Sequence, residues 1–232
     1  MLKIAQITDL HIGGDYNGKY KVKENFEKVI QAIPKDIDLL IITGDVVDDE
    51  RVAYVNPEDV EKNYNYVRDF IESNIKSDYL VLGGNHDDMN ILKDVFGDNC
   101  IASQVQNISF EDGIITLIDT SNGSLPMDIF SELDKNSVAI FTHYPLAKVS
   151  HKFMENFELE FLDKLEDEKL PDIFCGHFHF KHDEGNIHVT PSTQCQIDPS
   201  KEAFEVASYN PGYRIISIDD GKVTSEVFEV EV

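Results

Sequence analysis

Hydrophobic residues fall into strand-like and helix-like patterns that alternate over the first two-thirds of the chain. Short apolar runs between turn residues are typical of buried strands, whereas apolar residues three or four apart indicate one face of a helix. This pattern predicts strands over residues 2–8, 38–43, 79–82, 105–110, 114–119, 138–142 and 173–175. It predicts helices over residues 22–33, 56–71 and 157–165. Asn56 followed by Pro57 fits the start of the second helix, because asparagine caps helices and proline is accepted in their first turn.

The last part of the chain is rich in predicted strands. They cover residues 187–190, 213–218 and 223–230, and Asp220-Gly221 between the last two is typical of a hairpin turn. The sequence contains no internal repeat, low-complexity tract or linker. The alternation of strands and helices predicts an α/β fold, and we expect residues 1–232 to form a single domain.

The composition narrows the class of protein. Of the 232 residues, 41% are hydrophobic, which is enough for a sizeable core. The 44 acidic and 20 basic residues give a net charge of -24, which repels nucleic acid and anionic membranes at long range. Solubility or adaptation to salt would be enough to explain such a charge. A phosphate substrate is itself an anion, so its binding site would need bound cations to attract it.

The cysteines and the termini bear on the cellular compartment. Cys100, Cys175 and Cys195 are widely spaced, which argues against a disulfide framework and fits a reducing compartment. The first residues enter an apolar strand directly, without the pattern of a signal peptide. No stretch approaches the ~20 apolar residues that span a bilayer. We therefore expect a cytoplasmic protein with no membrane partner.

Metal-ligating side chains follow several of the predicted strands. Asp9 and His11 come after the first strand, and residues two apart on an extended chain point to the same side, so both could reach one ion. Asp45 follows the next strand, and its carboxylate could bridge two ions ~3.5–4 Å apart. Each stretch, considered alone, is equally compatible with an ordinary surface turn.

The stretch Gly84-Asn85-His86-Asp87 follows the third predicted strand. Asn85 could ligate through its amide oxygen, and a neutral ligand leaves a metal more electrophilic. His86 cannot point the same way as Asn85 on an extended backbone, so it could reach a substrate instead. The alternative is a glycine-asparagine turn with an unrelated histidine beside it.

Further histidines follow two later strands. A lone histidine such as His143 is more often structural than a ligand, and it gains weight only from the other stretches. His177 and His179 repeat the two-residue spacing found after the first strand and suit one ion, or one ion each of a close pair. The histidines without such a context, which we assign to the surface with the second as a candidate for a pocket rim, are His151, His182 and His188.

Together these stretches supply histidine, carboxylate and amide ligands. Such a mixture favours Mn²⁺, Fe²⁺/Fe³⁺ or Zn²⁺ over copper or iron–sulfur clusters, with positions left open for water. In open α/β sheets ligands collect at the carboxyl ends of strands, where each of these stretches lies. The sequence therefore predicts a centre of two divalent or mixed-valence metal ions.

The order of these motifs resembles that of the calcineurin-like metallophosphoesterase superfamily. The matching stretches are Asp9-Leu10-His11, Gly44-Asp45, Gly84-Asn85-His86-Asp87, His143 and Gly176-His177-Phe178-His179. The resemblance implies one metal held by Asp9, His11, Asp45 and His179, and a second held by Asp45, Asn85, His143 and His177. It also implies that His86 is the catalytic histidine that contacts the phosphate, and that Asp48 orients His86.

The C-terminal part is similar to that of bacterial class III 3',5'-cyclic nucleotide phosphodiesterases. The similar stretches are Thr190-Pro191-Ser192-Thr193, Gln196, Asp198-Pro199 and Pro211-Gly212-Tyr213-Arg214, together with Asn85-His86-Asp87-Asp88. The resemblance implies a four-layer αββα sandwich of two mixed β-sheets flanked by helices, and it allows a homodimer. In the protein-phosphatase branch Arg-Gly follows the position of Asp48, whereas Asp49-Glu50 stands here, which argues against a phosphoprotein phosphatase.

Metal-dependent hydrolysis of a phosphodiester, with 3',5'-cyclic AMP converted to AMP, is the hypothesis that uses all of these residues. A hydroxide bridging the two metals would attack phosphorus, and His86, kept protonated by Asp48, would donate a proton to the leaving oxygen. One alternative is a metallophosphoesterase acting on another small phosphodiester, a nucleotide or a phosphomonoester. Another is a metal-free protein-interaction scaffold, which should have lost ligands. The charge disfavours a nucleic-acid substrate.

Overall fold

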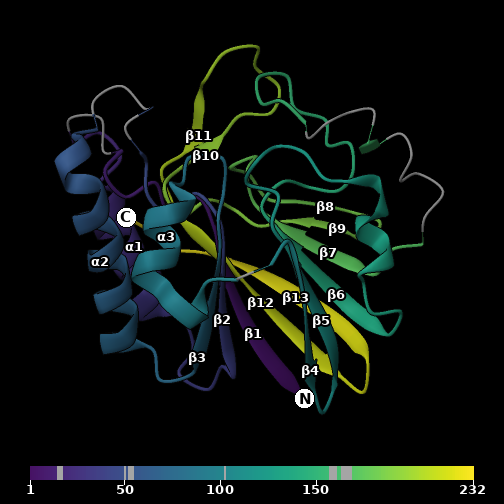
Figure 1. The fold of residues 1–232 in the computed structure, drawn as a ribbon. Coiled ribbons are helices and arrows are strands. Elements are labelled where there is room, and N and C mark those ends of the chain that lie inside the picture. The colour runs from purple at the N-terminus through teal and green to yellow at the C-terminus, as the bar shows by residue number, and fades with distance from the viewer. Residues whose placement is uncertain (15–17, 50, 52–54, 102, 157–160, 163–168) are drawn as a thin grey trace.

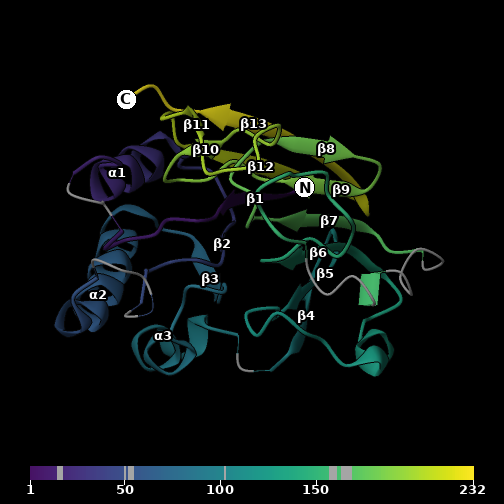
Figure 2. The ribbon, with the colours of Figure 1, turned by 90° about the horizontal axis from the view of Figure 1, so that it is seen from above.

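Two β-sheets stack face to face, and helices lie against the outer side of one of them (Figure 1, Figure 2). The structure is a computed structural model, and it describes residues 1–14, 18–49, 51, 55–101, 103–156, 161–162 and 169–232. Both sheets are mixed, with parallel and antiparallel neighbours. The α/β fold predicted from the sequence, with two mixed sheets and flanking helices, is confirmed.

The first sheet has the strand order β13-β12-β1-β2-β3. Its strands are β1 (Leu2–Ile7), β2 (Leu39–Thr43), β3 (Asp78–Leu82), β12 (Gly212–Asp219) and β13 (Lys222–Glu229). Strands β1, β2 and β3 are parallel, whereas β12 is antiparallel to β1 and to β13. The helices α1 (Val22–Ala32), α2 (Pro57–Asn74) and α3 (Met89–Phe96) lie beside this sheet in both views (Figure 1, Figure 2).

The second sheet has the strand order β4-β5-β6-β7-β9-β8. Its strands are β4 (Val105–Phe110), β5 (Gly113–Ile118), β6 (Ser137–Thr142), β7 (Asp172–Cys175), β8 (His182–Glu184) and β9 (Ile187–Val189). Its outer side packs on the 3₁₀ helix η2 (Met127–Ser131), on Leu146 and Val149, and on Phe161 and Leu162. The helix predicted over residues 157–165 lies outside the described residues except for Phe161 and Leu162, which are helical.

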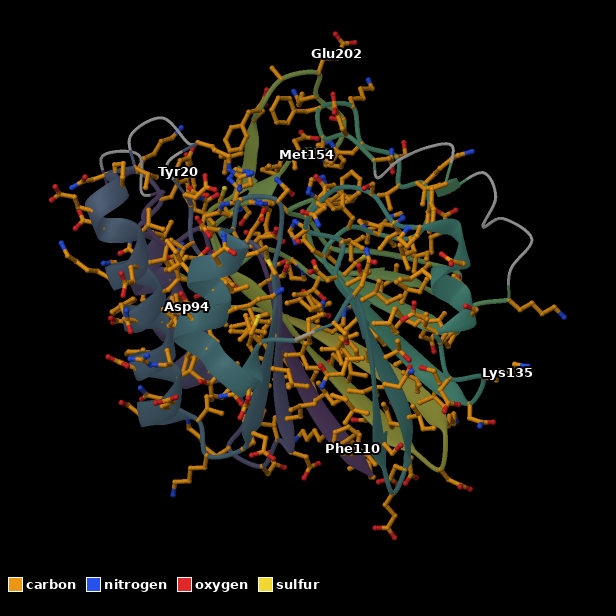
Figure 3. All side chains as sticks on the ribbon, in the orientation of Figure 1. Tyr20, Asp94, Phe110, Lys135, Met154 and Glu202 are labelled. Carbon is orange, nitrogen blue, oxygen red and sulfur yellow. The ribbon has the colours of Figure 1, made fainter. Side chains whose placement is uncertain are left out.

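A two-stranded ribbon, β10 (Gln196–Ile197) and β11 (Val206–Ser208), rises above the sheets (Figure 1). Glu202, between its strands, lies at the end of the molecule opposite to Phe110, where β4 ends (Figure 3). The short 3₁₀ helix η1 (Gly97–Asn99) follows α3. The carboxyl ends of β1, β2 and β3 point towards the ribbon, so that edge is the upper one in Figure 1.

Strand β2 shows why the sequence folds into layers. All of its residues are buried. Leu40 and Ile42 pack in the cluster under the helices, whereas Leu39 and Ile41 pack in the cluster between the sheets. The sequence of a strand that is covered on both faces is a continuous hydrophobic run, because neither face of the strand contacts water. The helices and the second sheet therefore enclose the middle of the first sheet.

Most predicted strands and the first two helices are present with bounds that differ by one to three residues at an end. Asn56 caps α2 as predicted, since its side chain accepts a hydrogen bond from the Glu58 amide at 3.3 Å. Helix α3 was not predicted, because it has only eight residues. The residue that could have indicated its start is Asp88, which caps the helix by accepting hydrogen bonds from the Asn90 and Ile91 amides. Among the described residues, no helix combines the length and the hydropathy needed to cross a bilayer.

Candidate metal centre

The predicted ligands all lie just beyond the carboxyl ends of parallel strands. Three of these strands, β1, β2 and β3, belong to the first sheet, and two, β6 and β7, belong to the second. Parallel strands end at the same edge, so both sheets deliver their loops to the upper edge in Figure 1. The residues brought together there are Asp9, His11, Asp45, Asn85, His86, His143, His177 and His179.

The local geometry differs from the extended one expected from the sequence. Strand β1 ends at Ile7 and β7 ends at Cys175, so neither ligand pair lies on a strand. Asp9, His11, His177 and His179 have positive φ angles of 53°, 50°, 70° and 55°. The expectation that the strand pleat aligns each pair is therefore wrong. The left-handed backbone turns the pairs inwards instead, and such strain persists only where surrounding contacts hold it.

The first group of ligand atoms gathers around two facing imidazoles. Nε2 of His11 lies 3.0 Å from Nε2 of His179. Oδ1 of Asp9 lies 3.5 Å from Nε2 of His179, and Oδ2 of Asp45 lies 3.6 Å from Nε2 of His11. All of these side chains are buried. Nitrogen and oxygen atoms that converge in this way could hold one cation.

The second group gathers around the side-chain oxygen of Asn85. Its Oδ1 lies 3.0 Å from Nε2 of His143 and 3.1 Å from Nδ1 of His177. Oδ2 of Asp45 lies 3.4 Å from Nε2 of His143. The same Asp45 oxygen therefore faces both groups, while its Oδ1 accepts a hydrogen bond from the His86 amide at 2.8 Å. This arrangement could hold a second cation that shares the Asp45 carboxylate with the first.

The far nitrogens of three imidazoles are held by neighbouring oxygen atoms. Nδ1 of His143 lies 2.8 Å from the Thr43 carbonyl, and Nε2 of His177 lies 3.0 Å from the Glu155 carbonyl. Nδ1 of His11 lies 2.6 Å from Oδ1 of Asp48. Contacts of this kind fix the ring orientation and the tautomer of metal-ligating histidines, which leaves the opposite nitrogen free to bind.

The electrostatics of the centre favour a bound cation. Burial, together with the nearby Asp45 carboxylate, raises the pKa of the Asp9 carboxyl above its usual range. Burial, together with His143, lowers the pKa of His177 to about 3, so its imidazole is neutral near pH 7. Although burial opposes it, the nearby carboxylates raise the pKa of His11 to about 10 and that of His143 to about 9. A divalent cation would displace these protons, because neutral histidine is the form that binds metals, and it would also favour the ionised form of Asp9. These donors therefore fit a metal centre.

Asp48 contacts two histidines rather than the single one expected. Its Oδ1 lies 2.6 Å from Nδ1 of His11 and 3.0 Å from Nδ1 of His86, although the angle at His86 makes no hydrogen bond. Although burial opposes it, the charges and contacts of His11 and His86 hold the pKa of Asp48 well below its usual range. The side chain of His86 is 33% exposed, whereas that of Asp48 is fully buried. His86 is thus the member of this cluster that faces solvent.

Asp87 has a structural role that the sequence did not reveal. Its carboxylate accepts hydrogen bonds from the amides of Val46, Val47 and Gly84 at 2.8–3.1 Å, and from the hydroxyl of Tyr64 at 2.8 Å. These bonds tie the loop after β2 to the loop after β3. Asp87 is part of the motif from Gly84 to Asp87 that the sequence showed, but the motif does not indicate which backbone amides its carboxylate binds.

An arginine stands beside His86 despite the departure from the protein-phosphatase pattern. Arg51 donates to the carbonyls of Asn85 and Asp87 at 3.0 and 3.2 Å and pairs with Asp49 at 2.5 Å. Its side chain is 62% exposed. The guanidinium of Arg51 therefore binds the backbone on both sides of His86, although the sequence motif predicts no arginine at this position.

The remaining histidines, His151, His182 and His188, are not among the residues brought together at the centre. His151 accepts hydrogen bonds from the Phe153 and Met154 amides, and His182 lies on the edge strand β8 beside Glu184. The surface assignment is wrong for His188. This residue is partly buried, and its nitrogens lie 2.8 Å from Asp183 and 3.2 Å from Asp172. It also stacks on a core phenylalanine of β7, so it belongs to the structure of the second sheet.

Comparison with known proteins agrees with this geometry. The profile described as calcineurin-like phosphoesterase matches residues 2–181. A Fibrobacter succinogenes protein named "Probable cyclic nucleotide phosphodiesterase" is 27% identical over 253 aligned residues, which cover 98% of this chain and 94% of that protein. The 3',5'-cyclic adenosine monophosphate phosphodiesterase CpdA of Vibrio vulnificus is 24% identical, and the alignment covers 97% of this chain and 89% of that protein.

A solved structure shares the fold. The 5'-nucleotidase from Candida albicans superposes with a TM-score of 0.52 at 12% identity, covering 98% of this chain and 51% of that one. At such low identity the likeness concerns the fold alone. The profile match, in contrast, extends over most of the chain and includes every loop of the candidate centre up to His179. The chain therefore belongs to the calcineurin-like phosphoesterase family and is a hydrolase of phosphoric esters.

Proposed function

We propose that this chain is a dinuclear-metal phosphodiesterase that hydrolyses a small phosphodiester, with 3',5'-cyclic AMP as its first candidate substrate. The observation that carries the proposal is the position of Asp45 Oδ2, 3.6 Å from Nε2 of His11 and 3.4 Å from Nε2 of His143. A carboxylate oxygen between two ligand groups is what a pair of close metal ions requires. Relatives named as cyclic nucleotide phosphodiesterases align over nearly all of the chain, which supports this choice of substrate.

The proposed ligands divide into two sets. One cation is held by Asp9, His11, Asp45 and His179, and the other by Asp45, Asn85, His143 and His177. Mn²⁺, iron and Zn²⁺ all suit these donors. When bound, two such cations supply electrostatic stabilisation of the phosphoryl oxygens and lower the pKa of a water nucleophile.

His86 is the proposed general acid. Its Nδ1 faces Asp48, so Nε2 is the nitrogen left to meet the substrate. Nδ1 of His86 lies 3.0 Å from the buried Asp48 carboxylate, and in the proposed reaction the imidazole donates a proton to the leaving oxygen. Partial exposure of His86 fits this role, because the substrate must reach it from solvent.

A substrate panel tests the proposal. The chain, loaded with Mn²⁺, iron or Zn²⁺, is assayed with cyclic AMP, cyclic GMP, bis-p-nitrophenyl phosphate and p-nitrophenyl phosphate. We expect both diester classes to be cleaved and cyclic AMP to give AMP. Much faster cleavage of the phosphomonoester than of any diester would show instead a phosphomonoesterase. Turnover of bis-p-nitrophenyl phosphate without any cyclic nucleotide would leave a phosphodiesterase of another small substrate.

The scaffold alternative has a separate test. A chain that binds no metal after dialysis against Mn²⁺, iron and Zn²⁺, and that cleaves none of the four esters, would be a protein-interaction scaffold. Metal analysis by plasma mass spectrometry reports the first property independently of the assay. The homodimer and the cytoplasmic location remain predictions from the sequence.

A further inference from the structure

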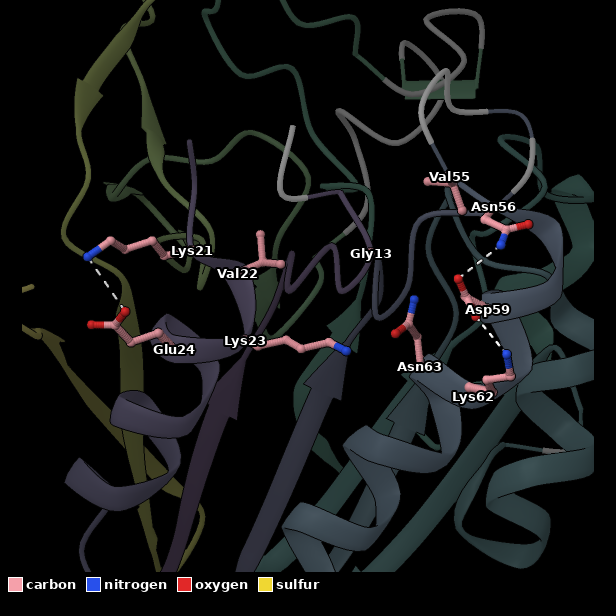
Figure 4. Close-up of a pocket in the computed structure, with 10 residues that line it drawn as sticks. All are labelled: Gly13, Lys21, Val22, Lys23, Glu24, Val55, Asn56, Asp59, Lys62 and Asn63. Atoms are coloured by element: carbon pink, nitrogen blue, oxygen red, sulfur yellow. Dashed lines mark hydrogen bonds and ion pairs between the residues drawn. The ribbon is translucent and has the colours of Figure 1, made fainter. Parts of the chain in front are cut away.

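A cavity of about 630 Å³ lies between the amino-terminal ends of α1 and α2 (Figure 4). Gly13 forms part of its wall, and so do the first turn of α1 and one side of the first turns of α2. Both helices follow strands that end at the edge of the candidate metal centre, so the cavity opens near that edge. None of the proposed metal ligands lines it. A volume in this range accepts a small metabolite rather than a single ion.

The cavity wall is basic although the protein is strongly acidic. The chain has 20 basic and 44 acidic residues, yet among the described residues that line the cavity there are three lysines, Lys21, Lys23 and Lys62, and two carboxylates, from Glu24 and Asp59. Each carboxylate already has a lysine partner, at 3.6 Å for Lys21–Glu24 and 2.8 Å for Lys62–Asp59. Lys23 extends across the cavity (Figure 4), and no ion pair of the described residues includes it. Its ammonium group lies 4.8 Å from the ring centre of Tyr66 on α2.

The helix ends add further positive potential. Helix α1 has 11 residues and starts after Lys21, which has a φ of 49° and whose side chain does not cap the helix. The amides of the first turn of a helix have no partners within the helix, and the helix dipole makes that end positive. Helix α2 presents its first turns from the other side, with Asn56 as its cap. The first turn of α2 already contains Glu58 and Asp59, so the amino terminus of α1 is the one that favours an anion in the cavity.

Asn63 is an independent sign of a ligand. Its side chain lines the cavity, where Figure 4 shows it between Lys23 and Asp59, and only 7% of the residue is exposed. No described residue forms a hydrogen bond with its amide group. The amide group is therefore free to form hydrogen bonds with a ligand in the cavity. Its Nδ2 lies against Gly13, where an added Cβ would come within 2.8 Å.

We propose that this cavity binds the phosphate group of a small phosphorylated ligand, either inorganic phosphate or a phosphomonoester such as a nucleoside monophosphate. Lys23 supplies a positive charge that is in no ion pair of the described residues, and Asn63 donates a hydrogen bond through its amide. The first-turn amides of α1 supply further donors. The site is distinct from the metal centre and needs no metal, so it does not depend on the proposed phosphodiesterase activity.

The test is calorimetric titration of the full chain with inorganic phosphate, AMP and adenosine. It is carried out with Mn²⁺-loaded protein and with protein in EDTA, where phosphate can no longer bind through metal ions. We expect phosphate-bearing ligands to bind in both states and adenosine not to bind. Equal affinity for phosphate and AMP would identify free phosphate as the ligand, whereas tighter binding of AMP would identify a nucleotide.

Three variants locate the site. Lys23→Gln and the nearly isosteric Asn63→Asp should each weaken phosphate binding in EDTA at least tenfold, while Lys222→Gln, a matched charge change on exposed β13, should not alter it. Lys23 is exposed, so its variant should fold even if Asn63→Asp does not, and circular dichroism checks both. Cleavage of bis-p-nitrophenyl phosphate should be the same in Lys23→Gln as in the wild type. The absence of metal-independent binding, or binding unchanged in Lys23→Gln, would overturn the proposal.

Discussion

His11 and His179 are 168 positions apart in the sequence, yet their Nε2 atoms lie 3.0 Å apart in the folded chain. Two neutral imidazoles cannot meet in this way with both lone pairs facing each other. A proton or a metal cation between them removes the repulsion, and carboxylate oxygens of Asp9 and Asp45 lie within 3.6 Å of the same nitrogens. The pair therefore links the loop after β1 of the first sheet to the loop after β7 of the second sheet through a shared proton or cation.

Removal of metal should consequently destabilise the protein. A ligand that binds only the folded state at 100 times its Kd adds roughly 2.7 kcal/mol to the free energy of unfolding. For a chain of this size that corresponds to roughly 5–10 °C in Tm. We expect EDTA to lower Tm by this amount and Mn²⁺ to restore it, as measured by circular dichroism. Equal Tm values in EDTA and in excess Mn²⁺, iron and Zn²⁺ would show that no cation bridges the sheets.

The shared carboxylate predicts different outcomes for two substitutions. Asp45→Ala should lower the metal content at both positions and abolish hydrolysis, because Asp45 Oδ2 faces both ligand groups. His86→Ala should keep both metals and lower kcat by roughly 10²–10⁴-fold, the usual contribution of general acid catalysis. Metal analysis and phosphodiester kinetics on the two variants give the comparison. Two metals retained in Asp45→Ala would disprove the bridge.

The sequence predicted which residues meet but not how they are turned towards each other. The order of the motifs and their place after strands predicted that the proposed ligand residues lie together, because parallel strands end at one edge. The alignment of Asp9 with His11 was attributed to a strand pleat, whereas both residues have left-handed backbones. Such conformations depend on long-range contacts, for example the hydrogen bond from the His11 amide to the Asp45 carbonyl. A local pattern contains no information about a contact across 34 residues.

The second role of Asp48 was hidden for the same reason. Its sequence position suggested a partner for His86 alone, but its closest contact is with His11 at 2.6 Å. Asp48→Asn should therefore weaken metal binding about 10–100-fold, as the loss of a histidine-orienting carboxylate usually does. It should lower kcat as well through His86. Competition with a chelator measures the metal affinity, and kcat at saturating metal measures the effect through His86. An unchanged metal affinity would show that Asp48 acts on His86 alone.

Position 84 should accept no residue larger than glycine, because a side chain there would clash with Asp45. A Cβ at this position would lie 2.2 Å from Oδ1 of Asp45, so Gly84→Ala must displace the shared carboxylate. We expect a loss of metal together with about 1–3 kcal/mol of stability, the usual cost of overpacking. Gly185→Ala is the control for metal binding, because a Cβ there meets nothing within 4 Å, although its φ of +60° strains the backbone of this variant. If Gly84→Ala bound both metals as tightly as Gly185→Ala, the close approach would be irrelevant to the centre.

An ion pair between a buried arginine and a partly exposed aspartate, away from the centre, predicts a pH-dependent stability. Arg214 on β12 is 1% exposed, and its guanidinium lies 2.8 Å from Asp183 on β8 of the other sheet. Burial raises the pKa of Asp183, but the hydrogen bond with His188 and the charge of Arg214 outweigh it, so the pKa is lowered. A carboxyl with a lowered folded-state pKa stabilises the protein above its unfolded pKa of about 3.9, and this contribution is lost as the pH falls through the folded value.

Asp183→Asn should therefore cost about 1 kcal/mol at pH 7, a modest value because the Asp183 side chain is 39% exposed to solvent. The same cost is expected at pH 5, and it should shrink below pH 4 as the wild-type carboxyl becomes protonated. Urea unfolding followed by circular dichroism at the three pH values measures it. Asp36→Asn, which removes an exposed pair with Lys3, serves as the control and should change little at any pH, because an exposed pair contributes less. A difference between wild type and Asp183→Asn that stays constant down to pH 3.5 would mean that the ionised carboxylate does not hold the sheets together, and that only the shape of the side chain does.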